Sequence, residues 1–126
     1  MHRAGDVAIS PNRAGVMWQL RERAMRSGEL AQRCALTAPA LTEQVDSLER
    51  EAYVRRREDP HDRRVVLVEL TTRGRRELDR YRERMTMSVA RVLAGLSSDQ
   101  RIRLRIALAD VRDVIDQFAK EMPDAR

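Results

Sequence analysis

Apolar residues recur at helical spacings in three stretches of the first half of the chain, and each stretch follows a helix start signal. Ser10-Pro11 combines a serine N-cap with a proline at the first helical position, where its missing N–H costs nothing. The stripe that follows consists of Val16, Leu20 and Ala24. Ser27-Gly28-Glu29-Leu30 predicts a second, short helix with Ser27 as its cap, ending near Ala35-Leu36.

Thr37 starts the third helix, which has Pro39 in its first turn. Its apolar stripe is Leu41, Val45 and Leu48. The opposite face carries only small or hydrogen-bonding residues: Ala38, Thr42, Glu43, Gln44 and Ser47. A short helix joined by a tight turn to a longer one is the helix-turn-helix arrangement, in which the longer helix presents its N-terminal turn to the major groove of DNA.

Two strands are predicted next, from Tyr53 to Glu58 and from Val65 to Leu70. Asp59-Pro60-His61-Asp62 joins them, with aspartate and proline at the first two positions of a type I turn. A hairpin directly after a recognition-type helix is the wing of a winged helix-turn-helix.

Arg55, Arg56 and Arg57 alternate across the first strand, so they cannot all face the same way. We expect one or two of them to contact phosphate and one to pair with Glu58 or Glu69.

The pattern changes again after Thr71, where apolar residues at spacings of three and four predict a helix of about seven turns. They are Leu78, Tyr81, Met85, Val89, Val92 and Leu96. Ser97-Ser98-Asp99-Gln100 is a capping box for the last helix. That helix has two stripes, one of Leu104, Leu108, Val111, Ile115 and Phe118 and one of Ile102, Ile106 and Ala109. One stripe can cover the chain's own core, and the other needs a partner, of which a second copy is the simplest.

The predicted fold class is therefore mainly α with a small β-hairpin. A winged helix-turn-helix in residues 1–74 is followed by two long C-terminal dimerisation helices in residues 75–126, all within one continuous domain of a size that 126 residues allow. We expect a frayed tail after Lys120.

Charge and composition favour contact with double-stranded nucleic acid. The net charge is +5 although 20 residues are acidic, which indicates local basic patches that meet phosphate at a defined place. Lys120 is the only lysine, but genomic base composition explains most of the arginine excess. Aromatic residues make up 3% of the chain, too few for the stacking platform that single-strand and RNA binders use.

Other classes of function find little support. Cys34 is the only cysteine, which excludes a disulfide framework within the chain, and its inward position predicts a buried, inert thiol. His2 and His61 stand too far apart for a metal site, and we expect no cofactor. Neither a nucleophile with a base at a recognisable spacing nor a glycine-rich phosphate loop is present, so we predict no enzyme. Without a membrane-spanning run or a signal-peptide core, the expected location is cytoplasmic.

Four segments together resemble the MarR family of bacterial transcriptional regulators: residues 36–50, 53–56, 59–64 and 68–74. The most specific part is the wing, Asp-Pro-x-Asp-x-Arg, which closes on Leu-Thr-x-x-Gly at the start of the long helix. The resemblance is clear from about Ile9 to Gly74 and holds for the two C-terminal helices in pattern only.

The resemblance implies a homodimer that binds a pseudo-palindromic operator through two winged helices, with the terminal helices forming the dimer interface. Many relatives are repressors released by a small aromatic ligand that binds between the DNA-binding lobe and the dimerisation helices. By matching position, Asp62 and Arg64 form an ion pair that braces the wing, leaving Arg63 and His61 to approach the minor groove. The candidate DNA-binding residues are Thr37, Ala38, Ala40, Thr42, Glu43, Gln44, Ser47, Arg56, His61, Arg63 and Arg64.

The chain departs from the family pattern in two respects. Relatives have a further N-terminal helix in the dimer interface, whereas about nine residues precede the first helix here; either the start is shortened or dimerisation rests on the two C-terminal helices. Ala52 stands where the family has glycine, and alanine resists the left-handed backbone expected there.

Two alternative hypotheses stay open. One is a winged-helix interaction module that does not bind DNA or that acts through a full-length relative. The other is a regulator without a small-molecule ligand.

Overall fold

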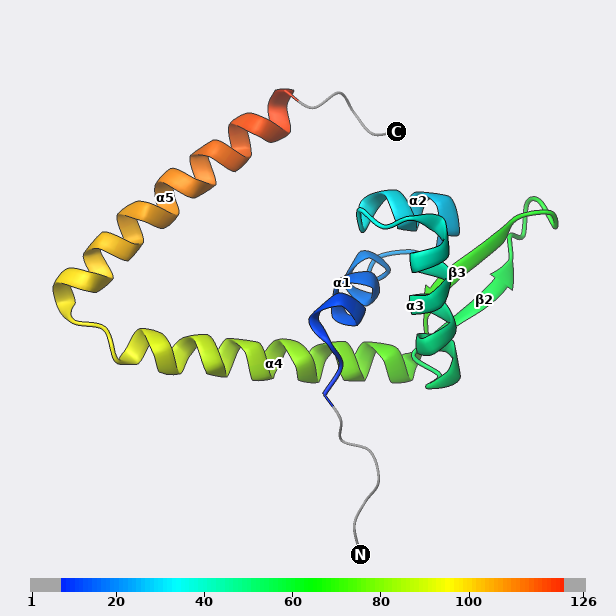
Figure 1. Cartoon of the computed structure of the whole chain (residues 1–126), viewed down its shortest axis with the longest axis horizontal. Coiled ribbons are helices and arrows are strands. Elements are labelled where there is room, and N and C mark those ends of the chain that lie inside the picture. Colours follow the sequence, from blue (N-terminus) through cyan, green and yellow to red (C-terminus); the bar gives the residue numbers. More distant parts are fainter. Residues whose placement is uncertain (1–7, 122–126) are drawn as a thin grey trace, which may run out of the picture. The chain divides into compact units, whose positions relative to one another are not determined.

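The computed structural model describes residues 8–121, which contain five helices and one three-stranded sheet (Figure 1). In chain order the elements are α1 (Pro11–Gln19), β1 (Met25–Arg26), α2 (Ser27–Arg33), α3 (Ala38–Arg50), β2 (Val54–Glu58), β3 (Val66–Leu70), α4 (Thr72–Ala94) and α5 (Ser98–Glu121). The predicted fold class, mainly α with a small β-hairpin, is confirmed.

The chain forms two compact units, one up to Met85 and the other from Thr86 onward. The division therefore falls inside α4. The functional division predicted from the sequence, between Gly74 and Arg75, stays a prediction.

Two of the three predicted helix starts are confirmed in detail. The Ser10 hydroxyl accepts a hydrogen bond from the Arg13 amide at 3.3 Å, and the Thr37 hydroxyl accepts one from the Ala40 amide at 3.3 Å. Ser27 is the first residue of α2 rather than its cap, because Arg26 occupies the cap position without a side-chain hydrogen bond.

The strand β1 is absent from the sequence-based prediction, which extended the first helix to Ala24. Instead α1 ends at Gln19, and the Leu20 amide bonds to the Met17 carbonyl at 3.1 Å, which tightens the last turn. Met25 then pairs with Val68 of β3. A strand of two residues is too short to leave a periodic pattern, so only its partner strand determines it.

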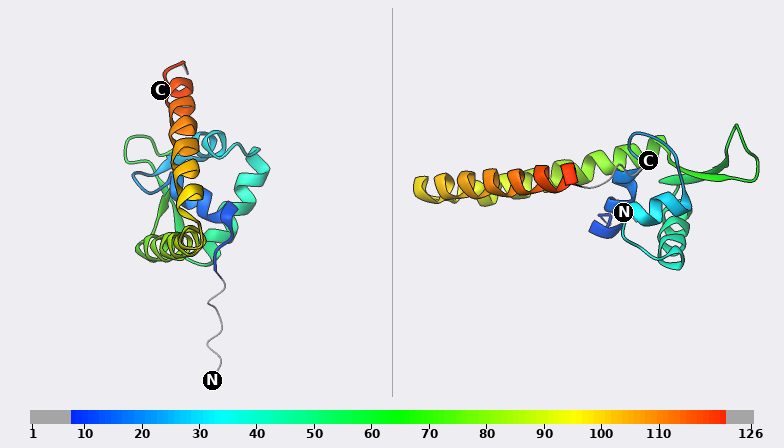
Figure 2. Two further views of the ribbon diagram at one scale, coloured as in Figure 1. Left: turned by 90° about the vertical axis from the view of Figure 1, so that its left-hand side faces the viewer. Right: turned by 90° about the horizontal axis from the view of Figure 1, so that it is seen from above.

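The sheet is antiparallel with strand order β1-β3-β2. β2 and β3 form the predicted hairpin, in register from Val54↔Leu70 to Glu58↔Val66. We call this hairpin, residues 54–70, the wing. Two views show that its tip extends beyond the helices of the first unit (Figures 1 and 2).

The core of the first unit anchors α3. The three predicted apolar residues of this helix, Leu41, Val45 and Leu48, are each at most 1% exposed. They pack in one cluster with the buried residues of α1, α2 and the sheet. Burial of a side chain of this size contributes about 2 kcal/mol, so the orientation of α3 relative to the other elements of the unit is firmly set.

Ala52 ends α3 with the left-handed backbone that the family's glycine implies at this place, although alanine resists it. Its φ is 60°, its amide bonds to the Glu49 carbonyl at 2.9 Å, and the Tyr53 amide bonds to the Leu48 carbonyl at 2.9 Å. This pair of bonds is a Schellman motif, which usually has glycine at the left-handed position. α2 ends in the same way, with Ala35 at a φ of 53°.

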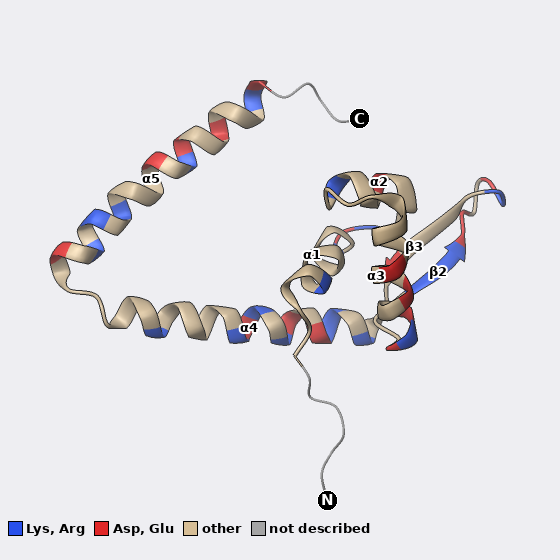
Figure 3. Ribbon diagram, in the orientation of Figure 1, with Lys and Arg blue, Asp and Glu red and all other residues tan. Residues whose placement is uncertain are grey.

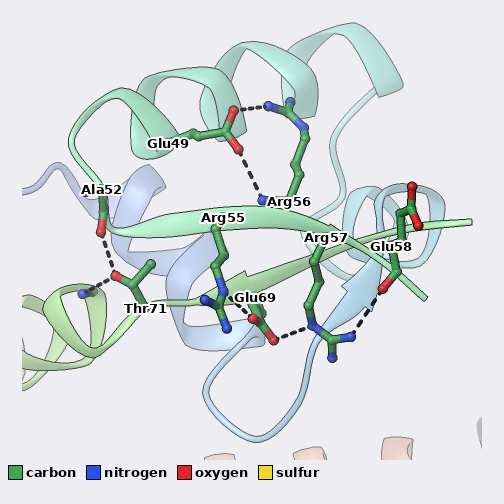
Figure 4. A network of polar contacts seen from close by, with 9 residues as sticks. Glu49, Ala52, Arg55, Arg56, Arg57, Glu58, Glu69 and Thr71 are labelled. Atoms are coloured by element: carbon green, nitrogen blue, oxygen red, sulfur yellow. Dashed lines mark hydrogen bonds and ion pairs between the residues drawn. The ribbon is translucent and has the colours of Figure 1, made fainter. Parts of the chain in front are cut away.

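The Leu-Thr-x-x-Gly segment joins the wing to α4. The Thr71 hydroxyl donates to the Ala52 carbonyl at 2.6 Å and accepts from the Gly74 amide at 3.0 Å, so it caps the new helix (Figure 4). A Cβ at Gly74 would overlap the carbonyl group of Tyr53. Glycine is therefore required at this position for close backbone approach.

The second unit contains the last turns of α4 and the whole of α5. The predicted capping box is confirmed, with the Ser97 amide bonded to Gln100 Oε1 at 2.9 Å and the Gln100 amide bonded to the Ser97 hydroxyl at 3.2 Å. α5 buries no residue within the described part of the chain. The expectation that one of its stripes covers the chain's own core is thus wrong: Leu104 and Ala109 are half-buried, and the other residues of both stripes are exposed.

α5 continues to Glu121, and the rest of the tail expected after Lys120 lies outside the described residues. Among residues 8–121, no helix is long and apolar enough to cross a membrane.

Candidate nucleic-acid interface

The tip of the wing is closed by hydrogen bonds at both of its ends. The Asp59 amide bonds to the Val65 carbonyl at 2.9 Å, and Asp59 Oδ1 accepts from the His61 amide at 2.8 Å. We predicted a type I turn over residues 59–62. The backbone bond between residues three apart instead joins the Val65 amide to the Asp62 carbonyl at 3.0 Å.

Asp62 and Arg64 form the ion pair expected from the family resemblance. Asp62 Oδ1 lies 3.1 Å from both the Arg64 backbone nitrogen and Arg64 Nε, and Asp62 Oδ2 lies 3.2 Å from Nη2. The hydrogen bond from the Arg64 side chain lowers the pKa of Asp62 below its ordinary value. The carboxylate is thus charged and fixed at neutral pH, and it holds the backbone of the tip.

Arg63 and His61 are exposed at this tip. Within residues 8–121 the Arg63 side chain forms neither an ion pair nor a hydrogen bond. Its guanidinium group is therefore available for a negatively charged partner such as phosphate.

The predicted DNA-facing side of α3 is only partly open. Thr37, Ala38, Thr42 and Glu43 are exposed, whereas Ala40, Gln44 and Ser47 are half-buried. Of these, Ala38, Thr42 and Glu43 border a depression of about 690 Å³ that also involves Asp46 and Arg50. The Thr42 hydroxyl donates to the Ala38 carbonyl at 2.9 Å, which leaves its methyl group and lone pairs for contact with a base edge.

Gln44 has a different environment from Thr42. It borders a separate depression of about 340 Å³ together with Val16 of α1 and Cys34 after α2. Burial raises the pKa of the Cys34 thiol above its ordinary value of 9.0, which disfavours the reactive thiolate.

The three arginines of β2 point to two faces of the wing, as their alternation predicts (Figure 4). Arg55 and Arg57 both pair with Glu69, with Arg57 Nε at 2.7 Å. The hydrogen bond from Arg57 lowers the pKa of Glu69. We expected one arginine to pair with Glu58 or Glu69; two do so, both with Glu69.

Arg56 points the other way, toward α3. Its Nη1 lies 2.9 Å from Glu49 Oε1, and its Nη2 lies 2.7 Å from Asp46 Oδ1. Neither carboxylate was among the candidate residues chosen from the sequence. The available signal was their spacing, since residues three apart lie on one side of a helix, here beside the strand that follows it.

Figure 3 shows the resulting charge pattern, with acidic residues along α3 and arginines along β2. Among residues 8–121, no group of three or more histidine, cysteine and acidic side chains could hold a metal ion.

Comparison with known proteins gives one family. Residues 9–66 match the model described as the MarR family. YkoM of Bacillus subtilis (strain 168), named an uncharacterized HTH-type transcriptional regulator, is 32% identical over 80 residues, which are 64% of this chain and 52% of YkoM. The chain spans about half the length of curated relatives that it matches, 52% and 55% for two of them.

Solved structures agree with this match. RV1404 from Mycobacterium tuberculosis is 25% identical, with 96% of this chain and 80% of that chain covered and a TM-score of 0.75. Wild-type MarR from E. coli, in its apo form, is 27% identical, with 82% and 78% covered and a TM-score of 0.69. The similarity thus extends beyond residues 9–66 to most of the fold.

Proposed function

We propose that the chain, whose residues 9–66 match the MarR family model, is a member of that family and a sequence-specific double-stranded DNA-binding regulator of bacterial transcription. Named relatives are transcriptional regulators rather than enzymes. The observation that carries the proposal is the combination of an open face on α3 with a braced wing that ends in the exposed Arg63.

In the proposed complex, the first turns of α3 lie in the major groove and the wing tip lies over the adjacent minor groove. Thr42 and Glu43 are the exposed residues able to contact base edges, through a thymine methyl group and a cytosine amino group respectively. Arg63, with His61 beside it, contacts the backbone or the minor groove. Arg64 contributes indirectly through its ion pair with Asp62.

We further propose that two copies form the active species through the second unit. Seven large apolar residues of α5 are more than half exposed: Ile102, Ile106, Leu108, Val111, Val114, Ile115 and Phe118. Together with the last turns of α4, α5 encloses an apolar groove of about 750 Å³. A soluble monomer rarely exposes an apolar patch of this extent, and a second copy supplies a matching one.

The charges of α5 suit antiparallel self-association. Basic residues concentrate in its first half and acidic ones in its second, mainly Arg101, Arg103 and Arg105 against Asp110, Asp113 and Asp116. Two copies aligned antiparallel would bring opposite charges together. Leu108→Glu should therefore give a monomer by native mass spectrometry, while Gln117→Glu, the same charge change at a polar position of the helix, should leave the dimer intact.

The proposed regulator is a repressor that a small aromatic ligand releases from its operator. A cavity of about 280 Å³ lies within the first unit between α1 and α4, bordered by Trp18, Leu78, Tyr81 and Arg82. Arg82 stacks on the Trp18 ring at 4.8 Å, so an aromatic acid would meet both an apolar wall and a cation there. Trp18 is the only tryptophan, and quenching of its fluorescence by aromatic acids tests this part of the proposal directly.

Fluorescence anisotropy tests DNA binding itself. A duplex of about 30 base pairs, selected by the protein from a random library, has room for two half-sites one helical turn apart. We expect binding at least about a thousandfold tighter than to a scrambled duplex, with a steep loss of affinity as salt rises. Arg63→Ala should weaken binding to the selected duplex. Equally weak binding to every duplex would contradict the proposal and favour the interaction module instead.

A further inference from the structure

Arg56 is bonded to α3 through both its main chain and its side chain. Its amide donates to Glu49 Oε2 at 3.1 Å and its Nη1 donates to Glu49 Oε1 at 2.9 Å (Figure 4). Its Nη2 donates to Asp46 Oδ1 at 2.7 Å. A single guanidinium group thus serves two carboxylates of the helix. The side chain is 30% exposed, so it is partly withdrawn from solvent.

The two carboxylates pose an electrostatic problem for the proposed function. Glu43, Asp46 and Glu49 lie on α3, and Arg50 is the only basic residue in this helix. An acidic helix placed in the major groove faces phosphates on both sides, within the range of about 8 Å over which charges act at physiological salt. Arg56 offsets part of this negative charge through its ion pairs with Asp46 and Glu49.

The same contacts fix the direction of the wing. β2 begins four residues after the end of α3, across the left-handed Ala52. Arg56 is near the middle of β2, so its bonds to Glu49 and Asp46 hold the strand against the helix beyond this joint. On the other face of the strand Arg55 and Arg57 are occupied by Glu69, which leaves Arg56 as the arginine of β2 that connects to α3.

We propose that Arg56 is a positioning residue of the interface rather than a phosphate contact: it offsets part of the negative charge of Asp46 and Glu49 and sets the direction of the wing relative to α3. This inference rests on the proposed DNA-binding function. It also revises the place of Arg56 among the candidate DNA-binding residues, because its donors are directed at carboxylates of its own chain.

A mutant cycle distinguishes a positioning role of Arg56 from a direct phosphate contact. Arg56→Ala should weaken binding to the selected duplex about tenfold, because it leaves two uncompensated carboxylates on the helix. Asp46→Asn combined with Glu49→Gln should change the affinity of the wild-type protein less than about threefold, yet restore most of the loss when added to Arg56→Ala. A direct phosphate contact predicts the contrary: the double change would raise affinity equally in both backgrounds and would not reverse the loss.

Arg63→Ala is the matched control, since Arg63 has no ion pair within residues 8–121. Its loss of affinity should not be reversed by the double change at Asp46 and Glu49. Arg56→Lys adds a second check, because lysine keeps the charge but cannot make the forked contacts. The Arg56→Lys variant should bind the selected duplex less tightly than the wild type. If Arg56 only contacted a phosphate, the lysine would keep most of the affinity.

The same variants measured by urea unfolding keep the two proposals distinguishable. If the wild type prefers no duplex, the proposed function fails. The contact of Arg56 with α3 would then still appear as non-additive changes in the free energy of unfolding among the Arg56, Asp46 and Glu49 variants. If the wild type binds its selected duplex and the cycle is additive in both affinity and stability, the role of Arg56 is refuted and the proposed function stands.

Discussion

Replacing Ala52 by glycine should stabilise the chain, although it removes a side chain. Ala52 has a φ of 60°, and the left-handed region costs a residue with a Cβ about 1–2 kcal/mol. Glycine avoids this cost but brings more conformational freedom to the unfolded chain, which costs about 0.4–1 kcal/mol. The difference predicts a gain of about 1 kcal/mol in the free energy of unfolding.

Urea unfolding followed by circular dichroism measures this gain as a shift of the midpoint with an unchanged slope. For a folding unit of this size, about 1 kcal/mol also corresponds to a rise of about 4–8 °C in Tm. Ala35→Gly should behave in the same way, since Ala35 has a φ of 53°.

Ala14→Gly is the control, because Ala14 lies inside α1 and is 4% exposed. There the same chemical change should destabilise the chain by about 1 kcal/mol or more, through lost helix propensity and a lost buried methyl group. Opposite signs at the two positions are the signature of the left-handed backbone. A loss of stability in Ala52→Gly would refute the reasoning.

Two further predictions concern α4 and the wing. Gly74→Ala should lower the free energy of unfolding by about 2 kcal/mol or more, because the new methyl group overlaps the Tyr53 carbonyl. Gly15→Ala is the control: Gly15 has open space inside α1, so this change should raise the free energy of unfolding by about 0.5–1 kcal/mol. A mild effect at Gly74 would contradict the close approach of the two backbone segments. The folded-state pKa of Glu69 lies below its ordinary value of 4.5 through the Arg57 hydrogen bond, so the stability this carboxylate contributes is present above that pH and is lost as pH falls through the folded pKa. A pH series of urea midpoints should therefore decline less steeply below about pH 4.5 in Glu69→Gln than in the wild type, and identical slopes would rule this contribution out.

The elements with local signals were predictable from the sequence. Ser10 and Thr37 cap their helices, the stripe of Leu41 packs inward, and the capping box at Ser97 forms, because each depends on residues within a turn or two. The left-handed backbone at Ala52 was expected from the glycine that relatives in the MarR family have at this place.

The elements that depend on distant partners were not predictable in this way. Met25 forms a strand only because it pairs with the edge of β3. The sequence-based prediction could not detect this pairing and therefore extended the first helix too far. Arg56 pairs with Asp46 and Glu49 because the chain reverses between α3 and β2. From the sequence we considered only acidic residues of the hairpin, Glu58 and Glu69, as partners for the arginines of β2. Sequence spacing orders neighbours along one element, and the choice among partners on different elements depends on the packed structure.

A hydroxyl-radical footprint on the selected duplex tests the central claim most directly, since it reports both the DNA contact and its symmetry. We expect two protected backbone segments related by a two-fold axis and separated by about one or two helical turns, with minor-groove protection beside each that disappears in Arg63→Ala. A single unsymmetrical site, or no protection at protein concentrations that saturate binding, would contradict the proposal of a dimeric winged-helix regulator.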